Sequence, residues 1–195
     1  MAIEIELKAW VDESEAARRT ITSFAAPVRT YRKDDAYWRA QEGTGPAGRG
    51  ALGSGVRVRR EDLSESGATV TFKRKEVRDG IEVNDEREFE VSDAEVFGEL
   101  LDRLGLAVWI RKRKTGEAWE AEGVAIELSE VEGLGSFVEL EILAEKDDPA
   151  TVAEARSRLL SVLRRIGIPQ SRIEARYYTE MLAEKAGEGP SALTG

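Results

Sequence analysis

Two segments of the sequence alternate glutamates with apolar residues. Glu4 and Glu6 lie in IEIELK, which ends with Lys8, and Glu139 and Glu141 lie in FVELEI near the other end of the chain. Strict alternation predicts β-strands whose carboxylates share one face. Pairs of carboxylates on one face supply the oxygen ligands that Mg²⁺ and Mn²⁺ prefer. The two segments therefore predict a site for a hard divalent cation.

Basic side chains alternate in the same way elsewhere in the chain. Arg57 and Arg59 alternate with valines, Lys73 ends the segment VTFK, and Lys112 and Lys114 share one face of a basic run. Arg binds phosphate oxygens through a bidentate fork, and Lys binds them as a point charge. Together with the glutamate pairs, this pattern suits a ligand that needs both signs of charge, namely a polyphosphate that carries divalent cations.

A sheet and several helices must position these side chains. The segments with strand-like alternation are residues 3–8, 56–59, 70–73, 88–91, 108–114, 124–128 and 137–142, with 30–38 as an eighth candidate. Turn residues such as those in VRDGI, residues 77–81, are expected to join antiparallel neighbours. Capping patterns ahead of apolar stripes predict helices from Asp12, Ser92 and Asp148, and a fourth helix is expected from about Ser171.

Four amphipathic helices need apolar surface, and the apolar faces of the strands are the available partner. A flat sheet would then show its charged face to water, whereas a barrel of seven or eight strands would direct that face into a lumen. The pattern leaves both arrangements open.

Residues 1–186 are expected to form a single domain, and residues 187–195 a disordered tail. Trp38, Trp109 and Trp119 are expected to pack in the core or on an outer wall rather than to stack on a base.

The composition excludes several kinds of chemistry. The 195 residues include neither cysteine nor histidine, so thiolate chemistry, disulfides and an imidazole base are ruled out. The formal net charge of −9 argues against a broad nucleic-acid surface, which is normally basic. The chain has no apolar run long enough to span a membrane, and its N-terminus lacks the layout of a signal peptide. A cytoplasmic protein that binds neither nucleic acid nor membrane is therefore expected.

A glycine-rich stretch interrupts the strands at residues 43–55. Its segment GTGPAGRG has the glycine spacing of a P-loop, but Arg49 and Gly50 stand where Lys and Ser or Thr are required. A P-loop is thus disfavoured, while a loop over a site and a plain flexible connection both remain open.

Several motifs are shared with a known family. Glu4-x-Glu6-x-Lys8 at the N-terminus resembles the ExExK signature of the CYTH superfamily, also called triphosphate tunnel metalloenzymes. Residues 130–141, EVEGLGSFVELE, resemble the most recognisable segment of that family. Four further pairs follow in the order expected for the family: Arg57-x-Arg59, Thr71-x-Lys73, Glu88-x-Glu90 and Arg176-x-Tyr178. The resemblance therefore covers about residues 1–182.

The resemblance implies an α+β fold, an eight-stranded antiparallel closed β-barrel with helices packed on the outside. It implies metal ligands at Glu4, Glu6, Glu127, Glu139 and Glu141 for Mg²⁺ or Mn²⁺. It implies triphosphate contacts at Lys8, Arg57, Arg59, Lys73, Lys112, Lys114 and Arg176, with Glu88 and Glu90 on the tunnel wall. The catalytic group would be Glu4, Glu6, Lys8, Lys73 and Glu141.

Two reactions share this machinery: cyclisation of ATP, as in class IV adenylate cyclases, and hydrolysis of a triphosphate, as in thiamine triphosphatases. ATP, another nucleoside triphosphate and tripolyphosphate are all candidate substrates. A non-catalytic binder of polyphosphate or of a phosphorylated signal and a plain interaction domain are the alternatives. A homodimer is compatible with the sequence, which does not determine the oligomeric state.

The chain departs from the family pattern at two positions. Gly116 stands where many relatives carry Arg, and Ser129 stands where an Asp is common. Lys112, one pleat away from Lys114, is the residue expected to substitute for the missing Arg. Both departures touch the expected phosphate and metal environment and weaken the assignment of one particular reaction.

Overall fold

The computed structural model describes residues 3–40, 55–62, 67–78 and 81–187, and for residues 73–78 and 85–86 it describes the backbone alone. Eight strands form the sheet: β1 (Ile3–Trp10), β2 (Ala26–Ala40), β3 (Val56–Glu61), β4 (Ala68–Arg78), β5 (Ile81–Val91), β6 (Leu106–Ala121), β7 (Val124–Val131) and β8 (Gly135–Ala144). The helices are α1 (Ser14–Thr22), α2 (Ala94–Arg103), α3 (Pro149–Ile166) and α4 (Tyr178–Lys185), with a 3₁₀ turn at Gln170–Arg172.

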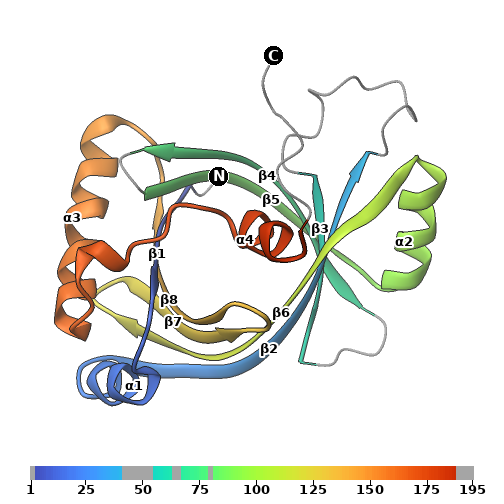
Figure 1. Cartoon of the computed structure of the whole chain (residues 1–195). Coiled ribbons are helices and arrows are strands. Elements are labelled where there is room, and N and C mark those ends of the chain that lie inside the picture. The colour runs from blue at the N-terminus through green and yellow to red at the C-terminus, as the bar shows by residue number, and fades with distance from the viewer. Residues whose placement is uncertain (1–2, 41–54, 63–66, 79–80, 188–195) are drawn as a thin grey trace.

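The strands close into a barrel in the order β1-β5-β4-β3-β2-β6-β7-β8, with β8 paired to β1. Every pairing is antiparallel. The expected eight-stranded antiparallel closed barrel of an α+β protein is therefore confirmed (Figure 1).

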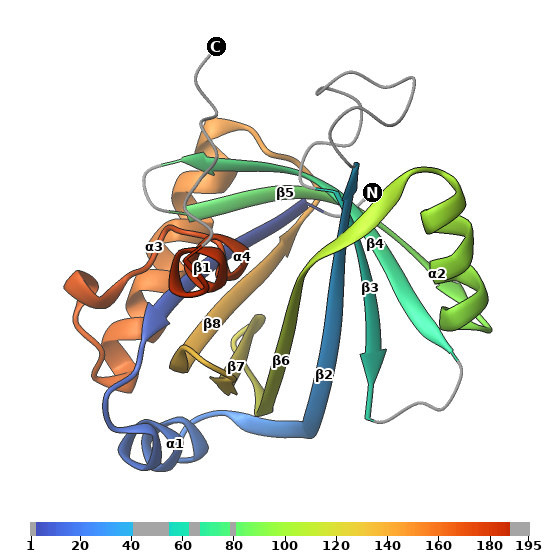
Figure 2. The same cartoon turned by 45° about the vertical axis from the view of Figure 1, so that its right-hand side comes forward.

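The apolar faces of the strands point outward, beneath the helices. Ile5 and Leu7 of β1 are fully buried in a cluster that includes Ile21 of α1 and Leu159 and Leu163 of α3. On the other side of the barrel, α2 packs through a second cluster, which contains Val56, Val58, Val70, Ala94 and Leu101. The helices α1, α2 and α3 lie outside the barrel (Figures 1 and 2). Because they cover the apolar faces, the charged faces of the same strands point into the barrel.

The last helix differs from the other three, because α4 lies across one end of the barrel (Figures 1 and 2). Tyr178 and Met181 of α4 pack with Phe137 of β8 and with Trp10, which closes this end with apolar side chains. The ring of Tyr178 meets the ring of Phe137 edge to face, with centroids 5.0 Å apart. One wall of the interior is thus provided by a helix rather than by a strand.

Three of the predicted helix starts need correction. Asp93, not Ser92, caps α2, and its carboxylate accepts hydrogen bonds from the backbone N–H of Glu95 and Val96. Asp12 does not cap α1, because its carboxylate pairs with Arg172.

The fourth helix begins at Tyr178 rather than near Ser171, because the preceding residues give their backbone hydrogen bonds to β1. Glu174 donates its N–H to the carbonyl of Lys8, and Ile173 forms a bridge with Ala9. The remaining predicted start, at Asp148, is confirmed, since Asp148 caps α3 and Pro149 occupies its first turn.

Two predictions fall on residues outside the described ranges. They are the glycine-rich stretch, of which only Gly55 is described, and the tail, of which only Gly187 is described. Among the residues that the structure describes, no helix combines the length and the apolar character that a membrane span requires.

Candidate functional site

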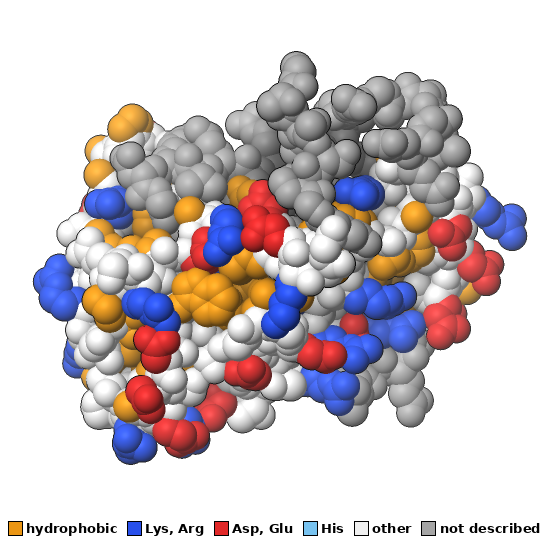
Figure 3. Space-filling view, viewed as in Figure 1, with side chains coloured by type: hydrophobic (Ala, Val, Ile, Leu, Met, Phe, Trp, Pro, Cys, Tyr) orange, Lys and Arg blue, Asp and Glu red, His pale blue; other side chains and the backbone are white. Residues whose placement is uncertain are grey.

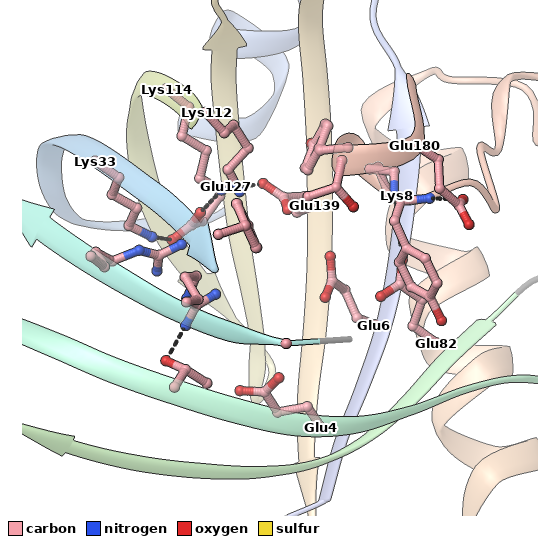
Figure 4. A pocket seen from close by; sticks show the side chains of 18 of the residues that line it. Glu4, Glu6, Lys8, Lys33, Glu82, Lys112, Lys114, Glu127, Glu139 and Glu180 are labelled. Atoms are coloured by element: carbon pink, nitrogen blue, oxygen red, sulfur yellow. Dashed lines mark hydrogen bonds and ion pairs between the residues drawn. The ribbon is translucent and has the colours of Figure 1, made fainter. Parts of the chain in front are cut away.

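The barrel encloses a cavity of about 590 Å³ whose wall carries both signs of charge. Most of the residues singled out in the sequence line it: Glu4, Glu6, Lys8, Arg57, Arg59, Glu88, Lys112, Lys114, Glu127, Glu139 and Glu141. Figure 4 shows Lys33, Lys112 and Lys114 gathered on one side of this cavity. Acidic and basic side chains also surround the barrel end that α4 covers (Figure 3).

The register of the strands brings the glutamates together. Glu6 of β1 is opposite Glu141 of β8 on one side and opposite Glu82 of β5 on the other. Glu139 of β8 is likewise opposite Glu127 of β7. Closing the barrel through the β1–β8 pairing is what joins the two ends of the chain into one acidic wall.

Two of the singled-out residues, Glu90 and Arg176, lie outside the cavity lining. Glu90 is exposed on β5 and lies outside the cavity lining, whereas Glu88 lies within it. Arg176 precedes α4 and pairs with Glu174 and Glu184, so its guanidinium is bound away from the lining residues. Lys73, also singled out, belongs to the part of β4 for which the structure describes the backbone alone.

Lys114 links the two inner carboxylates of the acidic wall. Its ammonium group pairs with Glu139 and lies 2.7 Å from Glu127. Glu127 also accepts from Lys33 at 2.6 Å and from the hydroxyl of Tyr31 at 2.8 Å. Burial alone would raise the pKa of Glu139, but the attraction of Lys114 outweighs it and lowers the pKa to about 2. Burial is likewise outweighed at Glu127, whose pKa is lowered by Lys114 and Lys33, so both carboxylates are ionised at neutral pH.

A second buried cluster is centred on Asp35 of β2, which is 0% exposed. Its carboxylate accepts a two-pronged contact from Arg59, at 2.7 and 2.9 Å, and lies 3.0 Å from the ammonium group of Lys112. Burial would raise the pKa of this carboxyl, but Lys112 and Arg59 hold it well below its usual range. Asp35 thus fixes the positions of two cations that the sequence predicted for phosphate binding.

Two further cations of the wall, Arg57 and Lys8, also have partners. Arg57 donates to Thr71 at 2.7 Å and to Glu88 at 3.0 Å. Lys8 is 3.3 Å from Glu82. A ligand phosphate would therefore have to compete with carboxylates for each of these cations, or bind beside them.

The carboxylates suit a hard cation in chemical terms, because all of their donor atoms are oxygens. Within the described residues, however, no three acidic side chains converge into a metal site. Glu127 and Glu139, both predicted as ligands, are engaged by lysines. Mg²⁺ usually binds to one or two carboxylates together with substrate phosphates, so a metal that arrives with its substrate does not need three converging carboxylates.

Sequence reasoning missed the contribution of β2. Tyr31, Lys33, Asp35 and Tyr37 alternate along this strand and lie at the two clusters or line the cavity. The strand itself was expected, and its alternation would have identified these residues if the segment had been assigned to the barrel interior.

Trp109 was expected to pack in the core or on an outer wall, and this expectation is wrong, because Trp109 lines the cavity. The register between β2 and β6 shifts there, with Tyr37 opposite Ile110 and Trp38 opposite Val108. Trp109 is the extra residue of this irregularity, which breaks the alternation and redirects a side chain. Trp38 and Trp119 are buried in the core clusters, as expected.

The structure also explains why position 116 lacks a side chain. A Cβ atom at Gly116 would lie 2.5 Å from the carbonyl oxygen of Leu128 and 2.8 Å from both the Cβ of Ser129 and the hydroxyl oxygen of Tyr31. Tyr31 and Ser129 therefore occupy the space that an arginine at this position would need. Lys33 of β2 lies next to Glu127 together with Lys114, whereas Lys112, the residue expected to substitute for the missing Arg, lines the cavity and pairs with Asp35.

We expect Gly116→Ala to lower the free energy of unfolding by about 1–3 kcal/mol, because a backbone carbonyl cannot move aside cheaply. Denaturant unfolding measures the effect. Gly98→Ala is the matched control, since its Cβ would lie 3.4 Å from the Trp38 side chain and alanine favours the helical conformation of α2. Equal stabilities of the two variants would contradict the close approach at Gly116.

Comparison with known proteins gives a consistent result. A family model described as the CYTH domain matches residues 2–178. No curated protein sequence matches the chain. Among solved structures, the protein PH1819 of Pyrococcus horikoshii OT3 is 28% identical, with a TM-score of 0.75 over 93% of this chain and 99% of that one.

Two further solved structures share the fold at lower identity. One, from Vibrio parahaemolyticus, is described as a candidate adenylate cyclase and is 18% identical, with a TM-score of 0.74 over 93% of this chain and 98% of that one. The other, a candidate adenylyl cyclase from Hippeastrum with a dominant triphosphatase activity, is 20% identical, with a TM-score of 0.67 over 96% of this chain and 97% of that one.

Proposed function

Because the chain belongs to the CYTH domain family, we propose that it is an enzyme that binds a triphosphate inside its barrel together with Mg²⁺ or Mn²⁺. The observation that carries the proposal is the cavity wall, where Lys8, Arg59 and Lys114 lie in one chamber with Glu4, Glu6 and Glu141. A triphosphate with its cations needs both kinds of group within reach of one another.

The basic residues would neutralise the phosphate oxygens and the charge that develops on them in the transition state. Arg59 and Lys112 are already oriented by Asp35, so little reorganisation is needed when the ligand binds. Glu4, Glu6 and Glu141 would hold the metal ion, which would polarise phosphoryl oxygens and supply an activated water in a protein without histidine.

Hydrolysis of the triphosphate is the reaction that we propose first, because it requires only that phosphates and a water be positioned in the chamber. Residues 130–135, which carry part of the family resemblance and look more like those of the cyclases, have a packing role in this chain. Gly133 and Leu134 lie against α4. The carbonyl of Gly133 accepts a hydrogen bond from the ammonium group of Lys185, and Leu134 packs against the cluster that contains Phe137 and Tyr178. These contacts help to hold α4 against β7 and β8.

One observation favours cyclisation of ATP as a second candidate. Trp109 lines the cavity, with the guanidinium of Arg39 lying 4.5 Å from its ring centroid. Indole rings and guanidinium planes are both surfaces on which nucleobases stack. A nucleoside triphosphate could therefore place its base here while its phosphates lie among the lysines.

Incubation with ATP and Mn²⁺ followed by product identification tests the two reactions. ADP with phosphate indicates hydrolysis, and cyclic AMP with pyrophosphate indicates cyclisation. If ATP is inert, tripolyphosphate is the next substrate. Failure to turn over either compound would refute the enzymatic proposal, while binding without turnover would indicate a non-catalytic polyphosphate binder.

Binding itself has a separate readout. With Mg²⁺ present, tripolyphosphate at 100 times its Kd should stabilise the fold by about 2.7 kcal/mol. For a chain of this size this corresponds to a rise in Tm of roughly 5–10 °C. A scan with Mg²⁺ alone is the control. An unchanged Tm in the presence of millimolar tripolyphosphate would favour a plain interaction domain.

A further inference from the structure

Tyr178 lies in the wall of the cavity, and its hydroxyl group is a buried polar group. Tyr178 is only 7% exposed, yet it belongs to the residues that line the chamber. Within the described part of the chain, its hydroxyl oxygen has no hydrogen-bond partner. Buried hydroxyl groups are rarely left without a partner, so this one calls for an explanation.

Packing fixes the ring in place. Its edge meets Phe137, with ring centroids 5.0 Å apart and the planes perpendicular. Two ammonium groups lie over the ring, that of Lys8 at 4.7 Å and that of Lys112 at 4.9 Å from the centroid. The aromatic ring therefore holds two cations predicted to contact the ligand, and its own orientation is set by β8 and α4.

The surroundings keep the hydroxyl protonated. Burial raises the pKa of Tyr178 well above its ordinary value, and the nearby charges of Glu139 and Glu6 raise it further. A protonated phenol is a hydrogen-bond donor at any physiological pH. The acceptor it suits best is an anionic oxygen, because hydrogen bonds to charged oxygens are the stronger ones.

We propose that the Tyr178 hydroxyl donates a hydrogen bond to a phosphate oxygen of the bound ligand, between the cations of Lys8 and Lys112. The inference rests on the proposed function and extends the site from the barrel strands to α4. The same aromatic ring would then orient two ligand-binding lysines and supply a third ligand contact.

Tyr178→Phe tests the proposal, because it removes the oxygen and keeps the ring with its contacts to Phe137 and the two lysines. We expect the Kd for tripolyphosphate, measured by calorimetry with Mg²⁺, to rise roughly 10- to 100-fold. Without ligand, the Tm of the variant should equal or exceed that of the wild type, since a buried hydroxyl without a protein partner contributes no stability.

Met181→Leu is the matched control, since Met181 packs in the same cluster of α4 and does not line the cavity. It should leave the Kd unchanged. Equal Kd values for Tyr178→Phe and the wild type would overturn the inference. So would a similar loss of affinity in Met181→Leu, which would assign the effect to the packing of α4. A wild-type protein that binds neither tripolyphosphate nor ATP would overturn the proposed function itself, and this inference with it.

Discussion

The double variant Glu4→Gln with Glu6→Gln is expected to lose at least about 100-fold of its metal-dependent turnover while it still folds. Glutamine keeps the shape of glutamate and removes the negative charge that a hard cation requires. Glu6 lies opposite both Glu82 and Glu141 in the register, so its neutralisation also relieves repulsion between carboxylates on adjacent strands. We therefore expect a Tm no lower than that of the wild type.

The measurement is the initial rate with the best substrate over a range of Mn²⁺ concentrations, together with a thermal scan without ligand. Glu13→Gln with Glu15→Gln is the matched control, because these exposed glutamates at the start of α1 make the same change in net charge away from the cavity. Retained turnover in the Glu4 and Glu6 variant would mean that the metal lies elsewhere. A large fall in its Tm would mean that the two carboxylates stabilise the fold rather than hold a cation.

The period-two pattern separated the apolar face from the charged face of β1 and β8, and the family resemblance supplied the closed barrel that turns the charged face inward. In β1 and β8 the glutamates alternate with residues that are almost fully buried, such as Leu7 and Leu140, and the helices need that apolar face. When helices cover the apolar faces from outside and the sheet closes, the charged faces of all strands line the same cavity. Local alternation and the need to cover apolar surface therefore predict the two faces of each strand, whereas the closure that encloses the charged faces came from the resemblance.

The pairing of charges could not be predicted in the same way. Lys114 meets Glu139 although the two residues lie on strands that do not pair with each other. Such contacts depend on the stagger of the closed barrel and on irregularities such as the one at Trp109, and neither is encoded in a local pattern. The position of α4 was missed for a related reason, because residues 173–174 bond to β1 instead of continuing a helix.

Asp35→Ala is expected to lower the free energy of unfolding by about 3–5 kcal/mol, because it leaves two buried cations, Arg59 and Lys112, without their carboxylate. Asp34→Ala is the matched control on the neighbouring residue. Asp34 faces outward and pairs with Arg113 at 3.3 Å in an exposed contact, which is worth at most about 1 kcal/mol. Denaturant unfolding of both variants at neutral pH measures the difference. Similar losses in the two would contradict the central role of Asp35.

The pH dependence separates the charge of Asp35 from its shape. A carboxyl whose pKa is depressed by folding adds stability above its unfolded pKa of about 3.9, and that stability is lost as the pH falls through the folded value. The stability gap between the wild type and Asp35→Asn should therefore be constant from pH 7 to about 5 and shrink below about pH 4. A gap that does not change on acidification would assign the effect to lost shape rather than lost charge.

A ligand offers a further check on the same residue. If the proposed function is correct, a bound triphosphate brings new negative charge to Arg59 and Lys112. Tripolyphosphate should then raise the Tm of Asp35→Ala more than it raises the Tm of the wild type, because it replaces a missing anion in one protein and competes with a present one in the other. An equal rise in both proteins would mean that the phosphates bind away from this cluster. The position of the anion would then have to be sought among Lys8, Lys33 and Lys114.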